Sequence, residues 1–168
     1  MRPALALALL ALSLACGSAP SFRRGVYRDE ELTFRVGSLP PPWRRVQVAG
    51  SDLAFHNDEV SGVVAVNAEC NREKDPPLRQ LLMQLVIGFT AREHVVEELI
   101  PLDGREALHG IVRARIDGVP MMLDLYVLKK DECLYDFSYA APPSTFERGR
   151  AEYEAFVQGF HVAPRRDR

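Results

Sequence analysis

The chain has 168 residues, of which 47% are hydrophobic and 26% are charged, and these proportions are ordinary for a globular domain. Its formal net charge is −2, and its arginine pairs are scattered along the sequence. Such a charge balance provides no basic field for a phosphate backbone, so we expect no nucleic-acid partner.

Residues 1–15 are expected to be an export signal rather than part of the fold. They begin with Arg2 and continue as a run of Ala and Leu that is shorter than the ~20 residues needed to span a bilayer. The run ends in Leu12-Ser13-Leu14-Ala15-Cys16, which resembles a bacterial lipobox, and the resemblance implies that Cys16 becomes the lipid-carrying, palmitate-labelled N-terminus. The alternative is an ordinary signal peptide that is cleaved nearby and leaves a free thiol.

Residues 16–26 are expected to comprise the lipidated cysteine and a short tether, because they are mostly small and polar and show no apolar periodicity. A tether of this length would hold the domain, residues 27–162, close to the membrane surface. The tail, residues 163–168, is expected to be loose.

Two further cysteines, Cys70 and Cys133, remain once Cys16 is used. Export to an oxidising compartment favours a disulfide between them. The bond requires the strand that ends at Cys70 to lie beside the strand that begins at Cys133, and sequence order alone does not establish this. Two free, buried thiols are the alternative.

The first half of the domain is expected to be mainly strand. Residues 32–36 alternate apolar with polar side chains, Pro40-Pro41-Pro42 ends that strand, and Trp43 begins the next one. Residues 52–56 and 62–70 are typical of a hairpin. Residues 78–89 then place leucines at helical spacing after an Asp75 cap, which predicts an amphipathic helix lying on a sheet.

Residues 105–139 are expected to form three consecutive antiparallel strands. Asp117-Gly118 predicts a tight turn that sets Ile116 opposite Val119, and residues 129–132 form the second turn. In this register one face is apolar core. The other face mixes aromatic with ionisable side chains, so we expect it to be too polar for a dry core and to be the only face that could carry chemistry.

A second helix is expected after Ser144, because Ser144 and Glu147 have capping-box spacing and aromatic residues follow at helical intervals. The sequence therefore predicts an α+β fold in which an antiparallel sheet is flanked by helices on both faces.

The sequence offers no motif for catalysis or metal binding. The four histidines lack zinc-site spacing, and there is no nucleophile elbow or glycine-rich phosphate loop, so we expect no enzyme, no metal and no cofactor. One weak ligand site is predicted on the mixed face, formed by His109, Arg113, Asp124 and Tyr126. The alternative is a set of ion pairs that bind no ligand.

The order of elements resembles the PsbP-like superfamily. The resemblance is carried by Leu32-Thr33-Phe34-Arg35-Val36, a proline-ended turn into Trp43-Arg44, a long helix, the antiparallel run and the aromatic helix. The superfamily includes an extrinsic photosystem protein, a Ran-binding nuclear import factor and DcrB-like bacterial lipoproteins. The resemblance implies an α/β/α sandwich that acts by docking to partners.

These observations together predict a membrane-anchored lipoprotein that faces the periplasm and binds an envelope partner without catalysis. Gly17 directly after Cys16 favours the outer membrane. The alternative function is a ligand-binding or transport accessory lipoprotein that uses the mixed face.

Overall fold

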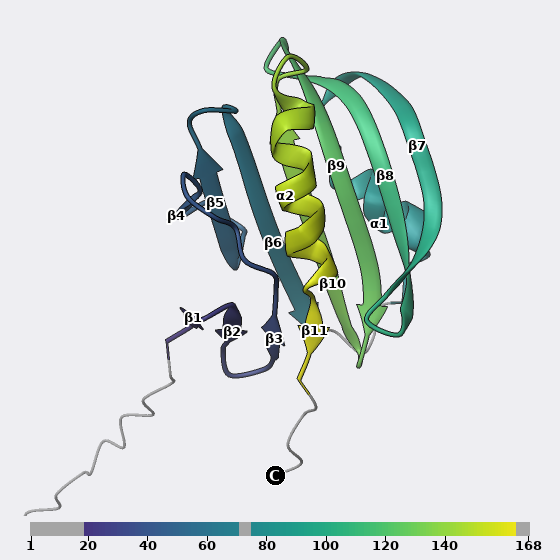
Figure 1. Ribbon diagram of the computed structural model, residues 1–168. Helices are drawn as coiled ribbons and strands as arrows, with labels where there is room; N and C mark the ends of the chain where they lie inside the picture. The colour runs from purple at the N-terminus through teal and green to yellow at the C-terminus, as the bar shows by residue number, and fades with distance from the viewer. Residues whose placement is uncertain (1–18, 71–74, 164–168) are drawn as a thin grey trace, which may run out of the picture.

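The computed structural model describes residues 19–70 and 75–163, which form two antiparallel sheets and two helices (Figure 1). The large sheet has the order β4-β5-β6-β10-β9-β8-β7, and the small sheet has the order β1-β2-β3-β11. Strand predominates over helix, as expected from the sequence.

The elements have the following bounds. The large sheet consists of β4 (Arg44–Val46), β5 (Leu53–Asn57), β6 (Gly62–Cys70), β10 (Cys133–Ala141), β9 (Val119–Lys130), β8 (Arg105–Ile116) and β7 (Thr90–Leu102). The small sheet consists of β1 (Ser21–Arg23), β2 (Val26–Arg28), β3 (Thr33–Arg35) and β11 (His161–Val162), and the helices are α1 (Leu78–Gln84) and α2 (Phe146–Gln158).

The predicted turn between β8 and β9 is confirmed. Asp117 and Gly118 have φ values of 49° and 82°, and Ile116 pairs with Val119. These two positive φ values explain why an Asp-Gly sequence sets this register. The following turn is tighter than predicted, because Lys130 already pairs with Cys133 and only Asp131 and Glu132 lie between them.

One apolar cluster joins α1 to β8 and β9. Leu82 is fully buried in it, and the cluster also contains Leu81, Val86, Leu108, Val112, Ala114, Leu123, Leu125 and Val127. Gly110 lies directly under the helix, since a Cβ there would lie 2.8 Å from Leu82 Cδ1. The predicted core face is therefore confirmed. The helix itself ends at Gln84 instead of Phe89, and no side chain caps its N-terminus.

The mixed face forms the larger core, so the expectation that it is too polar for a dry core is wrong. Its aromatic side chains are buried against α2 and the small sheet, with Tyr135, Phe137 and Tyr139 fully buried. The aromatic stripe of α2 was expected to lie on the sheet, but the cover by β1, β2 and β3 was not, because these strands come from the other end of the described chain. The face is sealed by aromatic contacts, including those between Tyr139 and Phe146 and between Phe137 and Phe160.

The helix α2 lies across the front of the large sheet in Figure 1. Its predicted aromatic stripe is buried, but the predicted capping box does not form, because Thr145 is the N-cap and makes no side-chain capping bond. Thr145 Oγ1 instead donates to the carbonyl oxygen of Val60 at 2.6 Å. Trp43 Nε1 donates to Glu152 Oε2 at 2.5 Å, so the helix is tied to the edge of the large sheet.

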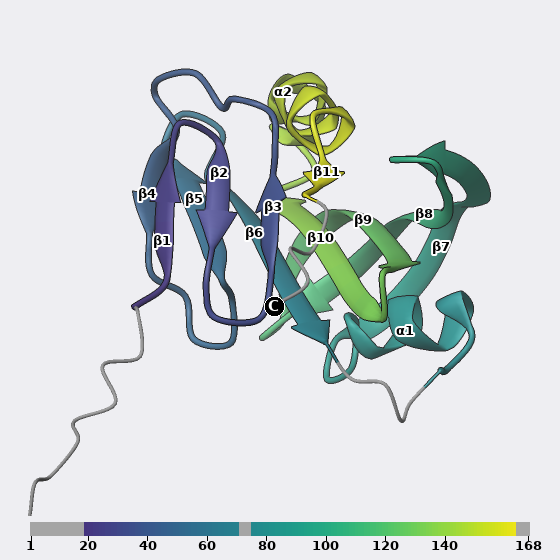
Figure 2. The same cartoon turned by 90° about the horizontal axis from the view of Figure 1, so that it is seen from below.

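The small sheet was not predicted (Figure 2). β1 and the start of β2 lie within residues 16–26, which the sequence suggested were a tether, so the fold already includes residues before residue 27. Tyr27 and Phe34 are buried in the larger core. The expected architecture, one sheet and two helices, therefore lacks the second sheet that the structure contains. This small sheet and α2 together cover the mixed face.

Candidate functional site

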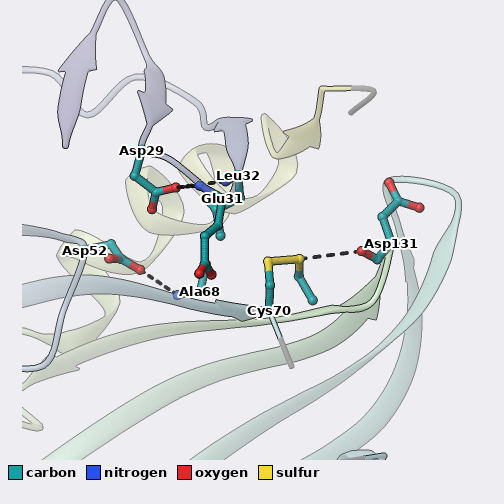
Figure 3. The surroundings of a disulfide bond; sticks show 8 residues. Asp29, Glu31, Leu32, Asp52, Ala68, Cys70 and Asp131 are labelled. Carbon is teal, nitrogen blue, oxygen red and sulfur yellow. Dashed lines mark hydrogen bonds between the residues drawn. A yellow bond between two sulfur atoms is a disulfide. The ribbon is translucent and has the colours of Figure 1, made fainter. Parts of the chain in front are cut away.

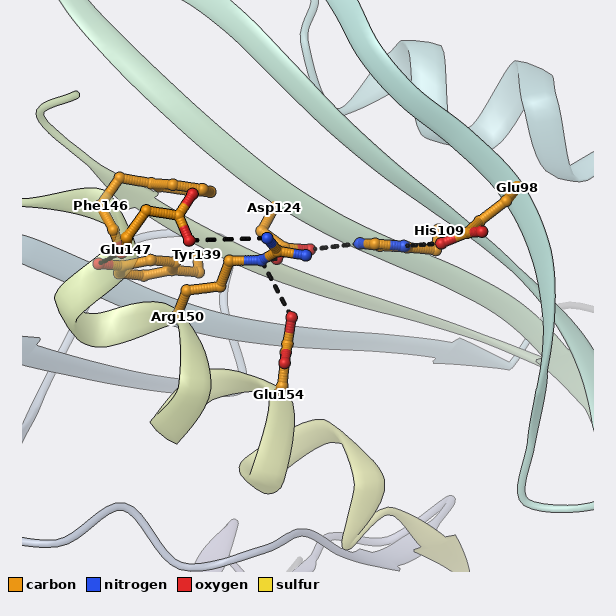
Figure 4. A network of polar contacts seen from close by, with 8 residues as sticks. All are labelled: Glu98, His109, Asp124, Tyr139, Phe146, Glu147, Arg150 and Glu154. Carbon is orange, nitrogen blue, oxygen red and sulfur yellow. Dashed lines mark hydrogen bonds and ion pairs between the residues drawn. The ribbon is translucent and has the colours of Figure 1, made fainter.

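Ionisable residues from the mixed face and from α2 meet in one charge network, which we define as Glu98, His109, Asp124, Arg150 and Glu154 (Figure 4). Strands β7, β8 and β9 supply the first three residues in that order, and α2 supplies the last two. The network thus crosses three adjacent strands and reaches the helix that covers them.

Asp124 lies at the centre of the charge network and is fully buried. One carboxylate oxygen accepts a hydrogen bond from His109 Nε2 at 2.9 Å, and the other accepts one from Arg150 Nε at 3.1 Å. Because each oxygen faces a cation or a cation-forming group, the charge of Asp124 is tolerated at full burial.

His109 lies between two carboxylates. Its Nδ1 is 3.0 Å from Glu98 Oε1, and its ring stacks on Tyr126 with the ring centroids 4.3 Å apart. Burial lowers the pKa of His109, but the hydrogen bonds to Asp124 and Glu98 outweigh burial and leave the pKa raised. Both ring nitrogens then donate, which is the hydrogen-bonding pattern of an imidazolium.

Arg150 provides the link to α2. Its Nε also lies 3.0 Å from Glu154 Oε1, one turn along the helix, and its Nη1 lies 3.7 Å from Glu147 Oε2. Burial lowers the pKa of Arg150, but the surrounding carboxylates, led by Asp124, raise it overall. The arginine therefore remains charged and balances Asp124 from the helix side.

Three of the four predicted site residues come together, and the fourth does not. His109 contacts both Asp124 and Tyr126. Arg113 points from the same face, but its Nη1 donates to Glu93 Oε2 at 2.6 Å and both of these side chains are exposed. Sequence reasoning missed Arg150. A signal was present in the spacing of Arg150 from Glu147 and Glu154, which favours ion pairs on a helix but says nothing of a buried aspartate.

The chemical capacity of the charge network is limited. Both oxygens of Asp124 and both ring nitrogens of His109 are occupied by other members of the network. Within residues 19–70 and 75–163, no group of three or more His, Cys, Asp or Glu side chains could hold a metal ion. The arrangement is suited to locking β7, β8, β9 and α2 together.

A separate hollow of about 690 Å³ lies between the start of α1 and the β9–β10 turn. Its side chains carry both signs of charge, and Lys129 binds the carboxylate of Asp75 across it. Its lining residues include Glu69, Gln80, Gln84, Arg105, Lys130, Asp131 and Glu132. Because both signs of charge line the hollow, it favours neither an anionic nor a cationic ligand.

The predicted adjacency of the two cysteines is confirmed, and the structure contains the Cys70–Cys133 disulfide (Figure 3). The two residues pair across β6 and β10, and Cys133 Sγ lies 3.5 Å from the carbonyl oxygen of Asp131. Cys16 and the predicted signal peptide lie outside the described residues.

No protein-family model matches the sequence, and no curated protein matches it. Solved structures do match the fold. Cyanobacterial PsbP (CyanoP) from Synechocystis aligns with a TM-score of 0.56 at 13% identity, over 83% of this chain and 87% of CyanoP. LpqN of Mycobacterium tuberculosis, described as involved in cell envelope biogenesis, aligns with a TM-score of 0.59 at 8% identity, over 87% of this chain and 90% of LpqN.

A third structure, the protein PA94 from Pseudomonas aeruginosa, aligns with a TM-score of 0.53 at 10% identity, over 89% of this chain and 98% of PA94. The chain therefore has a PsbP-like fold. In the described part of the chain, no helix has the length and apolar character needed to cross a bilayer.

Proposed function

We propose that this chain is a lipid-anchored lipoprotein of the cell envelope that faces the periplasm and docks to an envelope protein without catalysis. The lipobox-like sequence at Cys16 and the similarity in fold to LpqN support the envelope location. The occupied side chains of the charge network favour a structural over a catalytic role for the conspicuous ionisable residues.

The single observation that carries the docking proposal is the open edge of the large sheet at β7. This strand has 13 residues, pairs only with β8 in the sheet, and exposes most of its side chains. Val95 and Leu99 are 48% and 57% exposed. A long edge strand presents unpaired backbone groups, which an incoming extended segment can use to continue the sheet.

We propose that the partner docks along the second half of β7. The pairing of β7 with β8 is irregular between Thr90 and Glu93 and between His94 and Val96, and such bulges discourage strand addition. From Val96 to Leu102 the pairing is continuous. A partner strand would therefore align beside residues 96–102, next to Leu99.

The anchor proposal places the domain very close to the membrane. Only residues 17–20 separate Cys16 from the first residue of β1, Ser21. Labelled palmitate should be incorporated into the wild-type protein and be lost in the Cys16→Ser variant, and wild-type protein that takes up no label would reject the anchor. Gly17 favours the outer membrane as the destination.

The ligand-binding alternative is less well supported. It would require access to the mixed face near Asp124, which is fully buried beneath α2. The two oxygens of Asp124 already accept hydrogen bonds from His109 and Arg150, so a ligand that binds Asp124 would have to displace one of these side chains.

The docking proposal is tested by photo-crosslinking in cells. A photoreactive residue is placed at Leu99 on β7 and, as a matched control, at Val48, an exposed apolar residue (41%) outside the sheets. We expect one discrete protein adduct from position 99 and none from position 48. Identical adducts from both positions, or no adduct from position 99, would remove β7 as the docking edge.

A further inference from the structure

The outer face of the small sheet gathers arginines. In the register of this sheet, Arg23 pairs with Val26 and Val26 pairs with Arg35, while Arg28 pairs with Ser21 and Thr33. Residues two apart in a strand point to the same side, so Arg23, Arg28 and Arg35 share one face. Arg24 lies in the adjoining tight turn with a φ of 51°. We call these four residues the arginine face.

The opposite side of the same sheet is fixed to the core. Phe22, Tyr27, Phe34 and Val162 form one row across the four strands and contribute to the larger core. Phe22 packs edge-on against Phe55 of the large sheet at 5.8 Å between ring centroids. The arginine face is therefore held on a rigid support and turned outward.

The four arginines form no ion pair with the described part of the chain. All four side chains are exposed, and none forms an ion pair or side-chain hydrogen bond with another residue of the described part of the chain. No outward position on β1, β2, β3 or β11 is acidic. Acidic residues 29–31 lie in the β2–β3 turn, directly after Arg28 and at the opposite end of the strands from Arg24, and Asp103 contacts His161 of β11.

We propose that the arginine face lies against an anionic phospholipid surface and binds lipid phosphates. Guanidinium groups bind phosphate oxygens in a bidentate manner, and a flat rigid sheet can present several of them to one plane. Each basic residue held near an anionic bilayer strengthens binding by roughly fivefold.

The position of the anchor favours lipid over an acidic protein, and this step rests on the proposed lipidation of Cys16. The five-residue step from Cys16 to Ser21 spans at most roughly 17 Å. The strand it enters is β1, which carries Arg23. An acyl chain inserted at Cys16 would therefore keep the arginine face within reach of the headgroups, with β7 on the other side of the molecule (Figure 2).

The test uses the chain without its acyl group, so that the anchor cannot supply the binding. Residues 16–168 with Cys16→Ser contain every strand and helix of the fold, from Ser21 to Val162, and are prepared with the Cys70–Cys133 bond intact. Sedimentation is measured with vesicles of phosphatidylcholine alone and with vesicles that contain about one third phosphatidylglycerol.

The informative variant is Arg23→Gln/Arg28→Gln/Arg35→Gln. We expect binding to the anionic vesicles only, loss of that binding in high salt, and at least about tenfold weaker binding by this variant. Circular dichroism verifies that the variant is folded.

The matched control, Arg79→Gln/Arg113→Gln/Arg115→Gln, removes three positive charges from α1 and β8. This control variant should bind the anionic vesicles as well as the parent does. If both variants lose vesicle binding equally, net charge alone explains the binding, and the proposal is overturned. Binding to neutral vesicles, or no binding to anionic ones, would also overturn it. Palmitate labelling of Cys16 is a separate measurement, so the two proposals fail independently.

Discussion

Cys70 and Cys133 are direct partners in the register of β6 and β10, with their Cα atoms 4.0 Å apart and their sulfurs bonded. The bond closes a loop of 63 sequence steps that contains α1, β7, β8 and β9. The two strands pair along their length without it. The disulfide therefore secures the end of a ladder that the backbone already forms.

Removing this bond should weaken the fold without changing it. The Cys70→Ala/Cys133→Ala variant should lose up to about 4 kcal/mol of unfolding free energy, because the unfolded chain regains the entropy of a long loop. Urea unfolding of variant and parent measures the difference, and circular dichroism should show the same strand content. If the urea midpoint of the parent protein is the same with and without reductant, the disulfide is absent in solution.

The charge network should make stability depend on pH through His109. Its pKa is raised in the fold, because the hydrogen bonds to Asp124 and Glu98 outweigh burial. The stabilisation is therefore complete below the ordinary pKa of 6.5 and is lost as pH rises through the higher folded value. Denaturant unfolding at a series of pH values should show this decline above neutrality.

His109→Gln tests the assignment. This variant should lose about 3 kcal/mol at mildly acidic pH, because Asp124 loses one of its two charged partners. In this variant the decline of unfolding free energy above pH 6.5 should be absent. If the variant keeps the same decline, another group is responsible.

Asp136 on β10 should produce a second pH effect of the same sign. Burial, followed by repulsion from Glu69, raises the pKa of Asp136 to about 7, and its Oδ1 has no hydrogen-bond partner in the described part of the chain. The fold should lose stability as pH rises from 3.8 to about 7 and then level off. Asp136→Asn should remove this slope and stabilise the neutral protein by about 2 kcal/mol. A destabilised Asn variant would show that the carboxylate is favourably paired.

Gly149 should be intolerant of alanine although it lies within α2. A Cβ at this position would be 2.5 Å from Tyr139 Oη, which donates to the carbonyl of Phe146. Alanine normally gains about 1 kcal/mol over glycine in a helix, but here we expect a loss of about 1–3 kcal/mol from overpacking. Adding Tyr139→Phe should recover part of the loss in thermal unfolding. A stabilised Gly149→Ala variant would mean that the helix lies farther from the sheet.

The elements predicted correctly are those set by neighbouring residues. Asp117-Gly118 set the β8–β9 register because turn chemistry acts over two residues, and periodicity located α2 because its aromatic side chains repeat along one stretch. Elements whose determinants lie far apart in the chain were not predicted. Ser21 to Arg28 showed no clear pattern because three-residue strands are too short for one, and β11, which completes their sheet beside β3, comes from the other end of the described chain.

The candidate site was predicted in part for the same reason. His109, Asp124 and Tyr126 could be placed together from one hairpin register. Arg113 was included because it lies diagonally across from Asp124, but its guanidinium turns to Glu93 on β7. Arg150 could not be assigned, since nothing local to α2 specifies which strand residue the helix will cover.

The small sheet places β3, from the early part of the described chain, beside β11 at its end. β3 pairs on one edge with β2 and on the other with β11, whose two residues come after all the other strands and helices. During synthesis, β3 must therefore wait with an unpaired edge until almost the whole domain has been made. Contacts that span so much sequence slow folding. A chain that stops short of Val162 would leave the buried ring of Phe34 beside an open strand edge, which marks incomplete molecules for aggregation or proteolysis.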